Sequence, residues 1–146
     1  FFPVIVLPEQ TSAAQLRRTR PVLFLTVLAS ASIAVDSKLA AALNGELINS
    51  LAVRFFFRHE KSLDLILALI MMVVFHPPPE SPSESQIFQY THIAATMALE
   101  IGIASKRRVS RRPVEGKRAA QTRPSFDHRV AEQARAALAC YHLASK

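Results

Sequence analysis

The apolar run at residues 63–75 most restricts the fold of this chain, because apart from Asp64 every side chain in it is hydrophobic. A helix without a polar face must be covered on all sides, so we expect it to be a buried core helix. The proline- and serine-rich residues 76–85 cannot continue it, and helical periodicity resumes at residues 86–103. We therefore predict an αα-hairpin over residues 61–103, closed by Gly102 at a helix C-terminus.

The rest of the chain also favours helix over sheet. It has three glycines and no tryptophan, and half of its 146 residues are hydrophobic, many of them alanine or leucine. We predict an all-α fold, a multi-helix regulatory domain of about six helices that is incomplete at its C-terminal side. Its expected parts are an arm and short helix (1–20), a helical core (21–104), a basic flexible linker (105–126) and the start of a further helix (127–146).

Local signals place the helix starts. Side chains that can accept hydrogen bonds from free backbone N–H groups precede the expected helices, namely Thr11 or Ser12, Asp36 or Ser37, Ser62 and Asp127. The third helix is expected at residues 38–58, where an apolar residue recurs at every fourth position. Gly45 interrupts it at a cost of about 1 kcal/mol relative to alanine, which weakens the prediction of continuity there. The expected buried face of the last helix consists of Val130, Ala134, Ala137, Leu138 and Tyr141.

The net charge of +7 comes from one segment. Residues 106–123 hold eight basic residues and one acid, so the remainder of the chain is neutral. Three interpretations of this segment remain open: a solvated linker, which the pattern favours, a nuclear-import signal, or a contact with nucleic-acid phosphates. The segment has no aromatic residue for stacking on bases. The candidate import residues are Lys106, Arg107, Arg108, Arg111 and Arg112.

Ser110 is a candidate phosphorylation site within the same segment. It follows two arginines in the order that basophilic kinases prefer. A phosphate would add roughly −1.5 to −2 charges among the arginines, so we predict a charge switch at this position.

Enzyme activity is not expected. None of the five histidines pairs with another at helical metal-binding spacing, and no P-loop or nucleophile-elbow motif is present. Asp64 is expected in a first-turn capping position, Glu100 on a solvent-facing edge, and Cys140 as a packed thiol. One cysteine excludes an internal disulfide and a cysteine-based zinc cluster in this chain, so we predict no catalytic or metal-binding residue.

Several stretches resemble one known family. Residues 61–65, 97–103 and 132–141, together with the entry at residues 2–25, occur in the order typical of the helical regulatory (middle homology) region of fungal zinc binuclear cluster transcription factors. The chain departs from the pattern at Leu67, where a polar residue is common, and at Ala134, where an arginine is common. It also lacks the zinc cluster and the DNA-contacting residues of that family. We therefore expect a piece of a longer protein.

The resemblance implies a nuclear regulator of transcription in which this chain is the inhibitory or effector-sensing helical part. DNA binding, and zinc as a cofactor, would belong to a missing N-terminal cluster. Expected partners are the rest of its own chain, the transcription machinery or a small effector held in a groove, and the full protein could form a homodimer. The alternatives are a stand-alone helical interaction module and, more weakly, a membrane-associated helical hairpin. Stable membrane insertion is not expected, because the apolar runs at residues 21–35 and 63–75 are shorter than the ~20 residues of a span.

Overall fold

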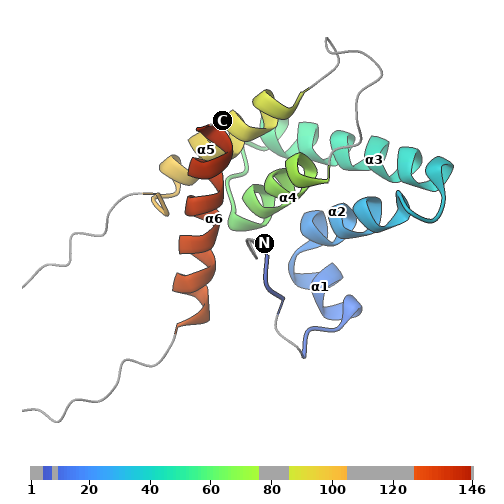
Figure 1. The fold of residues 1–146 in the computed structure, drawn as a ribbon, viewed down its shortest axis with the longest axis horizontal. Helices are drawn as coiled ribbons and strands as arrows, with labels where there is room; N and C mark the ends of the chain where they lie inside the picture. Colours follow the sequence, from blue (N-terminus) through green and yellow to red (C-terminus); the bar gives the residue numbers. More distant parts are fainter. Residues whose placement is uncertain (1–4, 8–9, 76–85, 105–126, 146) are drawn as a thin grey trace, which may run out of the picture.

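The computed structural model describes residues 5–7, 10–75, 86–104 and 127–145, and every regular element within these ranges is helical (Figure 1). The all-α prediction with about six helices is confirmed. The elements are α1 (Ala13–Thr19), α2 (Pro21–Ser32), α3 (Ser37–Ala52), the π-helical turn η1 (Val53–Phe57), α4 (Leu63–Val74), α5 (Ile87–Glu100) and α6 (His128–Ala144).

Four helices begin at the expected polar caps. The side chains of Ser12, Asp36, Ser62 and Asp127 each accept a hydrogen bond from a backbone N–H in the first turn of α1, α3, α4 and α6. These bonds satisfy donors that have no partner inside the helix. At the other end of α5, Gly102 adopts a φ of +78°, and the N–H of Ile103 donates to the carbonyl oxygen of Ala98. This is the Schellman ending that favours glycine.

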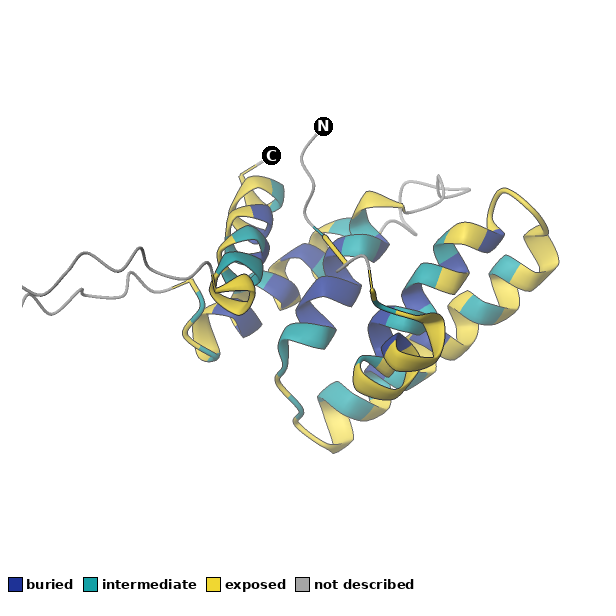
Figure 2. Cartoon of the chain, turned by 90° about the horizontal axis from the view of Figure 1, so that it is seen from below, coloured by how far each residue is buried: buried dark blue, intermediate teal, exposed yellow. Residues whose placement is uncertain are grey.

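Helix α4 lies at the centre of the fold and packs against α2, α5 and α6. Its six consecutive residues from Leu65 to Ile70 are all buried, as an all-round apolar helix requires. Figure 2 shows the buried middle of this helix in dark blue, whereas most residues of α3 are exposed. The expected buried helix is therefore confirmed, and it packs against α5.

The third helix differs from the prediction at its C-terminal end, whereas it is regular at Gly45. Helix α3 is continuous through Gly45, and a Cβ atom added to this glycine would meet nothing within 4 Å. The irregularity falls at Val53–Phe57, which form a π-helical turn in place of the expected α-helix. Three consecutive phenylalanines end this turn, and Phe56 and Phe57 are exposed while Phe55 packs against the core.

The predicted buried face of α6 is wrong. Val130, Leu138 and Tyr141 are exposed, and the helix instead buries Ala136, Ala139 and Cys140, with Leu143 packed at the edge of the core. Helix α6 packs mainly against α4 and α5, and these small buried side chains belong to the same hydrophobic core as the buried residues of those two helices. Residues 130–141 therefore form two apolar helix faces. The face with the smaller side chains, Ala136, Ala139 and Cys140, is the one buried in the core.

Candidate functional site

The predicted import cluster, Ser110 and the proposed linker at residues 105–126 lie outside the described residues. Their roles stay predictions. The proline-rich connection at residues 76–85 also lies outside the described part of the chain.

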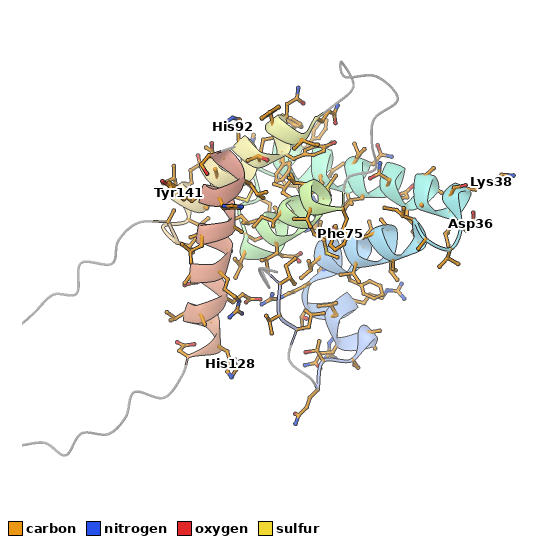
Figure 3. The ribbon with its side chains drawn as sticks, viewed as in Figure 1. Asp36, Lys38, Phe75, His92, His128 and Tyr141 are labelled. Atoms are coloured by element: carbon orange, nitrogen blue, oxygen red, sulfur yellow. The ribbon has the colours of Figure 1, made fainter. Side chains whose placement is uncertain are left out.

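The titratable residues singled out from the sequence lie at separate places, Asp64 at the start of α4, Glu100 at the end of α5 and Cys140 within α6. Cys140 is buried, and burial raises the pKa of its thiol from 9.0 to about 11. Glu100 is exposed as expected and pairs with Lys61. Figure 3 shows His92 on α5 and His128 at the start of α6. Within residues 5–7, 10–75, 86–104 and 127–145, no group of three or more His, Cys, Asp or Glu side chains is placed to hold a metal ion.

Asp64 lies in the first turn of α4, as expected, but its carboxylate caps a different helix. Its Oδ1 accepts a hydrogen bond from the backbone N–H of Leu23 at 3.1 Å, and its Oδ2 accepts one from Val22 at 3.4 Å. Both donors belong to the first turn of α2, whose own N-cap residue provides no side-chain acceptor. Burial raises the pKa of the Asp64 carboxyl, although these two hydrogen bonds and the nearby Arg20 favour its charged form.

Arg20 joins the α1–α2 junction to α6. Its guanidinium makes a bidentate pair with Glu132, with Nη1–Oε1 and Nη2–Oε2 distances of 2.5 and 2.7 Å. The hydrogen bond to Glu132 raises the pKa of Arg20, so the guanidinium stays charged. Asp64 also interacts electrostatically with Arg20. Arg20, Asp64 and Glu132 therefore form a polar network between the start of α2, α4 and α6.

A cavity of about 700 Å³ opens beside this network, and we call it the α1–α6 cavity. Its walls come from residues 6–7 and 10–11, from one side of α1, and from the first two turns of α6 (Figure 3). Val6, Leu7 and Leu16 make its apolar part, while Arg20, Arg129 and Arg135 bring positive charge. Its volume lies in the range of small-molecule sites, roughly 300–1,000 Å³.

Neither the polar network nor the cavity was predicted from the sequence. By position Arg20 follows Arg17 and Arg18 at the end of α1, where basic side chains commonly interact with the helix C-terminus. One local signal pointed elsewhere, because a residue directly before proline is biased towards extended backbone and leaves the helix. No local pattern, however, identifies Glu132 as the partner, since the pair is 112 residues apart.

Comparison with known proteins points to one functional class. The chain is 35% identical over 102 residues to "Transcription factor pbcR" of Emericella nidulans, a match that covers 67% of this chain and 14% of that protein. It is 20% identical over 117 residues to "Transcriptional regulator WAR1" of Candida albicans, covering 78% of this chain and 12% of that protein. The chain is similar to fungal transcription regulators. No protein-family model matches it, and no solved structure matches it.

The similarity is to part of each regulator, because the chain spans about one-seventh of the curated relatives' length or less. By name both relatives regulate transcription, which agrees with the expectation that this chain is not an enzyme. In the part of the chain that the structure describes, no helix combines the length and the apolar character needed to cross a membrane.

Proposed function

We propose that this chain is the helical regulatory region of a fungal transcription regulator and controls a DNA-binding module located elsewhere in the same protein. The observation that carries this proposal is the 35% identity to a fungal transcription factor over two-thirds of the chain. The helical fold and the resemblance of residues 61–65, 97–103 and 132–141 to the middle homology region support the finer assignment.

Zinc and DNA contact belong, in this proposal, to a zinc binuclear cluster outside the chain. Such a cluster needs several thiolates, and this sequence has a single cysteine, Cys140, which is buried. The relatives' names support a nuclear location for the full protein. Partners would be the rest of the protein, the transcription machinery or a small effector, and the full protein would be able to form a homodimer.

A fusion reporter tests the regulatory role. The 146-residue chain is placed between a heterologous DNA-binding domain and an acidic activation segment, and transcription of a reporter is compared with a matched fusion carrying Leu69→Asp. Leu69 is fully buried in α4, so a charge there should unfold the helical region. We expect the native chain to lower reporter output and the variant to release it.

Immunoblots and promoter occupancy of both fusions serve as controls for protein level and DNA binding. Equal reporter output from the two fusions at equal occupancy would contradict the regulatory role. Sequencing of full-length transcripts then tests the DNA-binding part of the proposal. A cysteine-rich cluster in the same open reading frame supports it, and its absence favours a stand-alone helical interaction module.

A further inference from the structure

The chain leaves α3 through an irregular backbone that holds two aromatic side chains outward. The turn at Val53–Phe57 is π-helical, and His59 adopts a φ of +51°, in the left-handed region that side chains other than glycine rarely occupy. Most of the Phe56 and Phe57 side chains is exposed. Both backbone features cost free energy, and proteins retain them most often where a surface binds something.

A cavity of about 350 Å³ opens beside these two phenylalanines, between the end of α3 and α5. Its apolar lining includes Phe55, Ile93 and Met97, and Phe55 and Met97 also contribute to the core. His92, which lines the cavity too, marks its place on α5 in Figure 3. An apolar cavity of about 150 Å³ is enough to hold a benzene ring, so this one accommodates the side chain of a phenylalanine.

We call Phe56, Phe57 and this cavity the π-turn surface. It has a protruding part and a receiving part next to each other, because Phe56 itself lines the cavity. An isologous contact between two copies of one chain requires this combination, since the same surface must both insert and accept. A twofold axis between the two parts would bring Phe57 of each copy to the cavity of the other.

The charged residues at the π-turn surface favour the same partner. Arg54 pairs with Glu60 at 2.8 Å and Lys61 pairs with Glu100 at 3.1 Å, and all four side chains are partly exposed. Both signs of charge therefore occur side by side, and such a surface can meet the opposite charges of a second copy. A strongly acidic or strongly basic partner would instead meet like charges at half of these groups.

We propose that two copies of this chain associate through the π-turn surface, with Phe57 of each copy inserted into the cavity of the other beside Ile93 and Thr96. The assembly closes at two copies, because the contact uses the same surface in both. The inference gives a place to the homodimer of the proposed function and in that sense rests on it. Association of the chain can nevertheless be measured by itself.

Sedimentation equilibrium of the 146-residue chain tests the dimer. We expect a monomer–dimer equilibrium that Phe57→Lys weakens about tenfold or more, because a charge would enter an apolar cavity. Val35→Lys is the matched control. Val35 is also an exposed apolar residue, and it precedes Asp36, which lies at the opposite end of the molecule from His92 (Figure 3).

Val35→Lys should leave the dimer unchanged, and circular dichroism should show that both variants keep their helices. A chain that stays monomeric overturns the inference and leaves the π-turn surface to a different partner. Assembly beyond two copies, or equal weakening by Phe57→Lys and Val35→Lys, also overturns it.

Cross-linking tests the contact itself and does not require the Phe57→Lys variant to fold. A tagged chain carrying Phe57→Cys is mixed with an untagged chain carrying Thr96→Cys and treated with a short bis-maleimide. Cys140 is buried and reacts little in the folded chain. We expect a higher yield of the linked heterodimer than with Val35→Cys in place of Phe57→Cys, and equal yields overturn the contact.

The fusion reporter separates this inference from the proposed function. Reporter output that is lowered by a chain that stays monomeric overturns the dimer and leaves the regulatory role intact. A dimer that depends on Phe57, in a chain without effect on the reporter, supports the π-turn surface and contradicts the regulatory role.

Discussion

Arg20, Asp64 and Glu132 each act on a helix other than their own. Asp64 satisfies two donors at the start of α2 from its place in α4, and Glu132 in α6 holds the guanidinium between α1 and α2. The Glu132 side chain is 13% exposed, so water competes little for its oxygens. Interactions of this type fix how helices sit relative to one another, which an apolar core alone specifies less strictly.

Replacing Asp64 tests the cross-helix cap. Asp64→Ala removes the acceptors of Val22 and Leu23 and is expected to lower the free energy of unfolding by about 1–2 kcal/mol. Asp64→Asn retains one acceptor oxygen and should lose less. Urea denaturation followed by circular dichroism measures both, and equal losses for the two variants would contradict the cap.

The pH dependence of Asp64 has a definite sign. Burial raises its pKa in the folded state, so the folded chain binds this proton more tightly than the unfolded chain. Its contribution to stability is fully present below the unfolded pKa and is lost as pH rises through the folded pKa. Between about pH 3 and about pH 7, the wild-type chain should therefore lose stability relative to Asp64→Asn. A constant difference between the two proteins across this range would show that the group does not titrate as described.

Cys140 should resist thiol reagents in the folded chain. A pKa raised from 9.0 to about 11 reduces the thiolate fraction near neutral pH about a hundredfold. We expect reaction with a maleimide to be slower by at least that factor in the native chain than in urea, where the thiol is exposed. Similar rates in the two states would place Cys140 on an accessible surface.

At the scale of helices, the sequence predicted the features that depend on neighbouring residues, namely the helix starts and the buried α4. The caps at Ser12, Asp36, Ser62 and Asp127 were identifiable because each acts within one turn of its own helix. The buried α4 was identifiable because its composition allows no exposed face. The π-helical turn at Val53–Phe57 was not, since its formation depends on how the chain leaves α3 and enters α4.

The packing of α6 shows where periodicity is insufficient. The helix carries an apolar face with Leu138 and Tyr141 and another with Ala136, Ala139 and Cys140, and either satisfies the helical spacing. Only the shape of the neighbouring α4 and α5 decides between them. The candidate cavity could not be predicted for a related reason, because its lining combines segments more than a hundred residues apart.

The central helix also allows a prediction of its own. Leu67 is fully buried, so Leu67→Ala should lower the free energy of unfolding by about 2–5 kcal/mol through lost burial and a residual cavity. Val74, at the end of the same helix, is 54% exposed, and Val74→Ala should change stability by less than about 0.5 kcal/mol. Similar losses at the two positions, measured by urea denaturation, would contradict the central position of α4.

At the scale of the whole molecule, large apolar side chains remain on the surface. Phe56, Phe57 and Tyr141 are 72, 79 and 76% exposed, and Leu138 lies near Tyr141 on the same helix face. Such surface is typical of contact regions or leads to self-association of an isolated chain. The chain therefore presents more apolar surface than its own helices cover.

Charging this surface should reduce self-association. We expect the double variant Phe57→Lys and Leu138→Lys to shift sedimentation profiles towards the monomer at high protein concentration, with little loss of stability because both side chains are exposed. Asn49→Lys, at an exposed polar position on α3, is a control for the added charge. A wild-type chain that is monomeric at every concentration would contradict the expectation.

The interactions that hold α2 also set an order of events during synthesis. Val22 finds its acceptor 42 residues later in the chain, and Arg20 finds its carboxylate 112 residues later. A nascent chain that has emerged only through α3 therefore has an uncapped α2 and an unpaired arginine at its start. Contacts so distant in sequence form late, because a long loop must close first. The N-terminal helices thus reach their final arrangement only once α6 has left the ribosome, because Glu132 in α6 is the partner of Arg20 between α1 and α2.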